Sequence, residues 1–196
     1  MRSMSVRIAL CSLTLLFGAQ APAQGAEVSG SSESTRVVFV CEHGSVKSLI
    51  ATAYFNRRAQ ERGLAYRAVA RGTAPEPLVP GPVRQGLQTD GFDVSEFVPR
   101  LFTSSDVDDA SLVVSFDQDV AKTVGGRARH FRWDNLPAVL ADYALGRDEI
   151  VTHVDELIDE LAHSFSLLRK GNGSKAPRSA CMRQIEARTA THIALL

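Results

Sequence analysis

Short apolar runs recur along the middle of the chain and predict buried strands. Residues 37–40 are apolar throughout and include three valines, and residues 112–116 form a second run of the same kind. Such runs are typical of strands that are covered on both faces of a sheet. Residues 65–73 alternate between apolar and polar positions, and residues 129–133 form a shorter run. The pattern therefore predicts about four strands.

Helical patterns separate these strands. Apolar residues follow helical spacing over residues 48–62, and Gly63 is placed to end that helix. Residues 82–90 indicate a shorter helix, and a long stripe of apolar positions predicts a helix over residues 147–168. Strands that alternate with helices predict one α/β domain, with a central parallel sheet of about four strands and helices on both faces. Right-handed crossovers bring the carboxyl ends of the strands to one edge, where such sheets bind ligands.

The N-terminal pattern is that of a secretory signal. Arg2 and Arg7 precede an apolar stretch, and the small residues AQAPAQGA follow it. The stretch has about ten residues, whereas about 20 are needed to span a bilayer, so we expect export with cleavage and no stable membrane insertion afterwards. A retained N-terminal anchor is the alternative. The chain then divides into a signal peptide at 1–26, a Ser-rich linker at 27–35, the α/β domain at 36–169 and a loosely ordered basic tail at 170–196. The expected location is the periplasm or the exterior.

Composition excludes some classes of partner. The chain has 22 basic and 22 acidic residues, so no basic face for nucleic acid is expected. His and Cys residues do not occur at metal-ligand spacing, so neither a metal nor another cofactor is predicted.

The segment that follows the first predicted strand carries the candidate chemistry. The strand ends at Cys41, and Lys47 and Ser48 follow where the helix is predicted to begin. A thiol that faces a helix N-terminus can act as a nucleophile on an anion held by backbone N–H groups. A lysine adds positive charge, and a neighbouring hydroxyl can donate to the thiolate. The predicted anion-binding residues are Glu42, His43, Gly44, Ser45, Val46 and Lys47, with Gly44 suited to a left-handed turn.

This arrangement resembles the low-molecular-weight protein tyrosine phosphatases and the arsenate reductases of the same fold. Their signature is a strand, Cys-x5-Arg-Ser and a helix, and Cys41, Lys47 and Ser48 stand at its nucleophile, cation and hydroxyl positions. Their Ser-Ala-Gly-Thr-like turn is similar to residues 70–73, and their later Gly-x-Asp segment, acidic stretch and strand are similar to residues 91–116. The resemblance covers residues 36–168. It implies the parallel α/β fold and a phospho-cysteine mechanism.

The sequence departs from this family in two ways. Lys47 replaces an arginine, so a point charge stands where a guanidinium would grip two phosphate oxygens. The family's general acid is an Asp followed by Pro, and this chain has no Asp-Pro dipeptide. Asp134, close after a tryptophan, is the first candidate for that acid, and Asp142 is the second. The alternative for each, and the commoner role of such a residue, is a helix cap or a solvated loop carboxylate.

The resulting expectation is a cysteine-dependent phosphatase-like hydrolase of phosphate monoesters, with phosphotyrosine as a candidate substrate. The expected partner is thus a phosphorylated substrate or an inorganic oxyanion. One alternative is a module that binds phosphate, arsenate or a phosphorylated ligand without turnover. A second is an arsenate reductase that uses an external thiol, because residues 111–124 contain no cysteine for an internal relay. Cys181 in the tail is a free thiol, a partner for another chain or a disulfide partner of Cys41.

Overall fold

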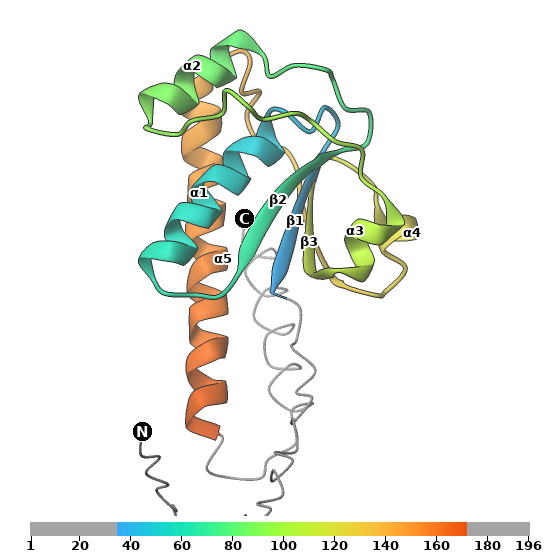
Figure 1. Cartoon of the computed structure of the whole chain (residues 1–196), viewed down its shortest axis with the longest axis vertical. Helices are drawn as coiled ribbons and strands as arrows, with labels where there is room; N and C mark the ends of the chain where they lie inside the picture. Colours follow the sequence, from blue (N-terminus) through green and yellow to red (C-terminus); the bar gives the residue numbers. More distant parts are fainter. Residues whose placement is uncertain (1–34, 172–196) are drawn as a thin grey trace, which may run out of the picture. The chain divides into compact units, whose positions relative to one another are not determined.

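The apolar runs form a four-stranded, all-parallel sheet in the order β2-β1-β3-β4, of which Figure 1 labels the first three strands. The computed structural model describes residues 35–171. The strands are β1 (Arg36–Cys41), β2 (Arg67–Gly72), β3 (Ala110–Phe116) and β4 (Arg129–Trp133). The helices are α1 (Lys47–Glu61), α2 (Gly81–Thr89), α3 (Ser104–Asp108), α4 (Ala121–Val124) and α5 (Tyr143–Gly171). The predicted signal peptide, Cys181 and all of the predicted tail beyond Gly171 lie outside the described residues, as does the predicted linker except Thr35.

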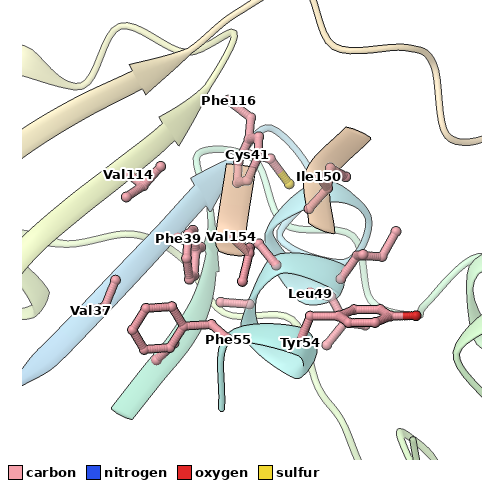
Figure 2. Close-up of a cluster of buried hydrophobic side chains, with 14 of the residues drawn as sticks. Val37, Phe39, Cys41, Leu49, Tyr54, Phe55, Val114, Phe116, Ile150 and Val154 are labelled. Carbon is pink, nitrogen blue, oxygen red and sulfur yellow. The ribbon is translucent and has the colours of Figure 1, made fainter. Parts of the chain in front are cut away.

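Helices cover both faces of this sheet, as the sequence predicts. On one face, Phe39 of β1 packs in a large cluster with Phe55 of α1 and Ile150 of α5 (Figure 2). On the other face, Val38 of β1 packs in a smaller cluster with Val107 of α3. This cluster also contains Val120, just before α4, and Val124, the last residue of α4. Figure 1 shows α1 and α5 on one side of the strands and α3 and α4 on the other. The alternation of side chains along β1 therefore buries both of its faces.

The helix boundaries differ from the prediction mainly where helices are short or begin in a loop. Helices α3 and α4 are not predicted from the sequence, because one or two turns give little periodicity. Helix α5 begins at Tyr143, four residues before the expected start at Arg147, and continues two residues past the domain boundary expected at residue 169. The early start follows from Asp142, whose carboxylate accepts the Leu145 N–H at 3.0 Å and so caps the helix.

A largely buried polar network holds the start of α5 against α1 and α2. The Tyr143 hydroxyl donates to Asp90 at 2.7 Å, and Arg147 donates to the other oxygen of Asp90 at 2.8 Å. Burial, together with the Asp90 carboxylate, holds the pKa of Tyr143 well above its usual value. Gly86 of α2 leaves the space that the Tyr143 ring fills, since a Cβ there would lie 2.3 Å from the ring. The network fixes where the loop that follows β4 rejoins the core.

Parallel pairing brings the carboxyl ends of the strands to one edge of the sheet. Cys41 pairs with Gly72 of β2, and the preceding residue, Val40, pairs with Ser115 of β3. The residue after β3, Asp117, therefore lies at the same edge as Cys41.

Among the described residues, no helix is both long enough and apolar enough to cross a membrane.

Candidate active site

The Cys41 thiol lies where β1 ends, beneath the loop that leads into α1. The residue is 5% exposed and belongs to the large hydrophobic cluster, and Figure 2 shows its sulfur among the labelled side chains of that cluster. Its Sγ lies 3.1 Å from the Ser48 hydroxyl oxygen and accepts the Gly44 N–H at 3.3 Å. Ser48 is fully buried, so its hydroxyl is held in this place. An ionised sulfur here would have two donors directed at it, which is what a thiolate nucleophile requires.

The cysteine loop (residues 41–47) is shaped by two glycines in close contact. Gly44 has a φ of +69°, the left-handed region that glycine adopts without a steric penalty. A Cβ on Gly44 would lie 2.8 Å from the Gly72 backbone nitrogen, and a Cβ on Gly72 would lie 2.8 Å from the Gly44 nitrogen. Any side chain at either position would therefore push the loop away from the end of β2.

Backbone hydrogen bonds turn the carbonyls of this loop away from its interior. Residues 73–76 run beside the loop and donate to the carbonyls of Cys41, Glu42 and His43, at 3.0, 2.9 and 3.3 Å. Within residues 35–171, no backbone hydrogen bond is found from the N–H groups of His43, Ser45 or Val46. A loop with bonded carbonyls and unbonded N–H groups is suited to hold an anion.

The N-terminus of α1 adds to this anion-binding character. The helix begins at Lys47, has 15 residues, and has neither a side-chain cap nor an acidic residue in its first turn. Its first N–H groups and the positive end of its dipole therefore remain available to an anion. The Cys41 sulfur lies at this end of the helix, because Ser48, in the first turn, is its neighbour.

Lys47 points across the edge of the sheet to the loops after β3 and β4. Its Nζ donates to Asp117 Oδ2 at 2.6 Å and to the Leu136 carbonyl at 3.3 Å. The other carboxylate oxygen of Asp117 accepts the Asn135 N–H at 2.9 Å. Burial opposes ionisation of Asp117, but hydrogen bonds from Lys47 and Asn135 and the positive charges of Lys47 and Arg132 outweigh it and lower its pKa. The cation of the site is thus part of an ion pair.

The other loop residues named from the sequence differ in exposure. Ser45 and Val46 are buried, and the Ser45 hydroxyl has no hydrogen-bond partner among the described residues. The Glu42 side chain is exposed, and His43 lies between two carboxylates, 3.9 Å from that of Glu42 and 3.4 Å from that of Glu76. Within residues 35–171, no group of three or more His, Cys, Asp or Glu side chains is placed to hold a metal ion.

The two candidate acids have different surroundings. Asp134 follows the last residue of β4, at the same edge of the sheet as Cys41 but two strands away, and its carboxylate pairs with Arg132 at 2.7 Å. Asp142 caps α5 through the Leu145 N–H. The structure thus brings Cys41, Gly44 and Ser48 into contact and directs Lys47 to Asp117. Neither candidate acid has a hydrogen bond to these residues within 35–171.

Sequence reasoning missed Asp117, although a signal for it was present. It directly follows the buried strand at residues 110–116, as Cys41 ends the strand at 36–41. Two such strands that are neighbours in a parallel sheet place the residues at their carboxyl ends side by side. The order of the strands in the sheet was the missing information.

Comparison with known proteins agrees with this geometry. Residues 36–164 match the family described as low molecular weight phosphotyrosine protein phosphatase. A search of curated proteins finds no match to this chain.

Solved structures of the same fold include both phosphatases and a reductase. One is a low molecular weight protein tyrosine phosphatase from T. tengcongensis, 21% identical, with a TM-score of 0.57 over 65% of this chain and 99% of that chain. Another is the arginine phosphatase YwlE from Bacillus subtilis, 19% identical, with a TM-score of 0.58 over 64% of this chain and 95% of that one. A third is a thioredoxin-dependent arsenate reductase from Corynebacterium glutamicum, 20% identical, with a TM-score of 0.57 over 68% of this chain. This chain spans 65% of the reductase's length. The family match covers most of the chain and includes the Cys41 loop, so the chain belongs to the low molecular weight phosphotyrosine protein phosphatase family.

Proposed function

We propose that this protein hydrolyses phosphate monoesters through a phospho-cysteine intermediate on Cys41. The observation that carries the proposal is the pair of donors at the Cys41 sulfur, the Ser48 hydroxyl at 3.1 Å and the Gly44 N–H at 3.3 Å, at the N-terminus of α1. Such donors stabilise a thiolate, and the unbonded N–H groups of the loop suit the non-bridging oxygens of a phosphoryl group. Family membership supports a cysteine-based, phosphatase-like activity.

The proposed reaction has two displacement steps. The Cys41 thiolate attacks phosphorus, a P–S bond forms, and the P–O ester bond breaks while a carboxylic acid protonates the leaving oxygen. Water then attacks phosphorus, the carboxylate takes its proton, and the P–S bond breaks to release phosphate. Loop N–H groups and the Lys47 ammonium hold the phosphoryl oxygens throughout. Because the family's description names phosphotyrosine, it is the first biological ester that we would test as a substrate.

Asp134 is the proposed acid, with Asp142 as the second candidate. Asp134 lies at the carboxyl edge of the sheet, and to act as the acid it must carry a proton in place of its ion pair with Arg132. Asp142 already accepts the Leu145 N–H at the start of α5, which leaves it less free to move toward a substrate. Loss of turnover in Asp134→Asn but not in Asp142→Asn would support this choice, and the reverse result would exchange the two roles.

The test of the proposed function is hydrolysis of a generic aryl phosphate by the reduced full chain. We expect the aryl alcohol and phosphate in equal amounts, and a phosphate adduct on Cys41 when the reaction is quenched rapidly and its peptides are weighed. Lys47→Arg should raise turnover, because a guanidinium forms two parallel bonds to the phosphoryl oxygens. A protein that releases no phosphate, forms no adduct and is still stabilised against heat by phosphate would be a binding module instead.

That binding module is the second candidate, and the lysine at position 47 favours it. An ammonium can still attract an anion, but it lacks the two parallel bonds by which a guanidinium holds the phosphoryl oxygens during turnover. Arsenate reduction with an external thiol is an outcome of the same assay, since arsenite release that depends on added thiol would identify it.

Ser48→Ala is expected to lower kcat by about 10–100-fold, because a hydrogen bond to the ionised sulfur is lost. Ser115→Ala is a matched control, since Ser115 is equally buried but bonds His130 at 2.9 Å. Steady-state kinetics of both variants check the prediction. Equal losses of kcat in the two would show that the Ser48 hydroxyl has no special role at the sulfur.

Export is also part of the proposal, supported by the basic, apolar and small-residue order of residues 1–26. The N-terminal sequence of the protein taken from its native compartment tests it. A chain that still begins at Met1 would overturn cleavage and favour the retained N-terminal anchor.

A further inference from the structure

The Lys47–Asp117 ion pair has a geometry that bears on anion binding. An ammonium group has three N–H donors, and two of those on Lys47 are directed at Asp117 Oδ2 and the Leu136 carbonyl. The Lys47 side chain is 18% exposed and that of Asp117 is 43% exposed, so the ammonium is shielded from solvent more than the carboxylate. An oxyanion at the cysteine loop therefore meets an ammonium whose charge is already balanced.

Backbone strain is concentrated at the same contact. Within residues 35–171, the non-glycine residues with positive φ are Asp117, at 52°, and Asn135, at 62°. These two residues are hydrogen bonded to each other, and Lys47 bonds Asp117 and the residue after Asn135. Strained backbone persists where the surrounding structure fixes it, and it is common at functional sites. The ends of β3 and β4 are thus held in unfavourable conformations around one lysine.

We propose that Asp117 sets the oxyanion affinity of the site, as a built-in counter-ion that competes with the bound anion for Lys47. The inference rests on the proposed function, because it assumes an oxyanion at the cysteine loop. An arriving anion must draw the ammonium away from Asp117 or share it, and either change costs part of the ion-pair energy. Asp117 thereby lowers affinity for free anions such as inorganic phosphate.

The other side chains near this ion pair have hydrogen-bond or ion-pair partners of their own. Arg132 adds positive charge near Asp117, but its own guanidinium is paired with Asp134. Gln118, next to Asp117, accepts the Thr73 hydroxyl and is neutral. Asp119 lies two residues after Asp117, and its carboxylate accepts the Ala121 N–H at 3.1 Å. Asp117 is the carboxylate that contacts Lys47.

The experiment is titration calorimetry with inorganic phosphate on the reduced full chain, at fixed pH and ionic strength. Asp117→Asn should bind phosphate about tenfold more tightly than the wild type, within the usual range of coupling between two sites. Asparagine keeps the shape, accepts the Asn135 N–H and tolerates positive φ, so the loops should stay in place. Asp119→Asn is the matched control, because it removes the same charge nearby and should change affinity less than about twofold.

A double-mutant cycle assigns the effect to Lys47. In the Lys47→Gln background, Asp117→Asn should no longer tighten binding, since the competed cation is absent. Weaker or unchanged binding in Asp117→Asn would overturn the proposal and make Asp117 a positioning residue. An equal gain in Asp119→Asn would reduce it to a general charge effect. If the protein hydrolyses the aryl phosphate but Asp117→Asn binds phosphate no more tightly, only this inference fails. If no variant binds phosphate or hydrolyses the ester, the proposed function fails as well.

Discussion

Replacing Cys41 with serine is expected to lower turnover of an aryl phosphate by on the order of 10⁴-fold or more. A serine hydroxyl at this position is far less nucleophilic than a thiolate, and the structure supplies hydrogen-bond donors at the sulfur but no neighbouring base among the residues that bond it. Initial rates on the reduced wild type and variant, with the product alcohol measured by absorbance, give the result.

The control for this variant is retention of the fold and of phosphate binding. Serine is close in size to cysteine, and the loop N–H groups do not depend on the sulfur for their direction, so phosphate should protect both proteins equally against heat. A variant that folds, binds phosphate and keeps more than about a tenth of wild-type turnover would exclude Cys41 as the nucleophile.

Gly72→Ala is expected to lower turnover by about a hundredfold, because it displaces the cysteine loop. The added Cβ would lie 2.8 Å from both the Glu42 carbonyl oxygen and the Gly44 nitrogen. These are backbone atoms that cannot rotate away, so the loop must shift relative to β2. Overpacking of this kind also lowers the free energy of unfolding by about 1–3 kcal/mol. Kinetics and denaturant unfolding measured on the same sample check both effects.

Gly81→Ala is the matched control for Gly72→Ala. A Cβ on Gly81 has no heavy atom within 4 Å, and its φ is not in the left-handed region. Turnover and stability should therefore remain close to those of the wild type. Gly72→Ala with unchanged kinetics would mean that the loop does not need its contact with β2 in order to act.

The strand and loop around Cys41 could be predicted because their signals are local. A continuous apolar run, a cysteine at its end and a helical pattern from Ser48 onward are all contained in residues 37–62. The parallel sheet followed from the alternation of such units, since parallel strands need crossover helices. The structure confirms the sheet and the helices on both of its faces.

The short helices and the start of α5 were not accessible in the same way. Helix α3 has five residues and is held by a capping box between Thr103 and Asp106 rather than by a periodic apolar face. The first turn of α5 is held by the Asp142 cap and by Tyr143, which bonds Asp90, the residue after α2. Periodicity does not reveal a turn whose stability comes from a contact with a distant segment.

The sequence alone determined the nucleophile candidate, the predicted anion loop and the parallel fold, because each is a pattern of neighbouring residues. Only the tertiary structure decided the state of the cation, since Lys47 and Asp117 are 70 positions apart and meet because β1 and β3 are adjacent in the sheet. It also decided why residue 72 is glycine, through the close approach of β2 to the cysteine loop. Both contacts depend on the order of strands in space, which side-chain periodicity along the chain does not encode.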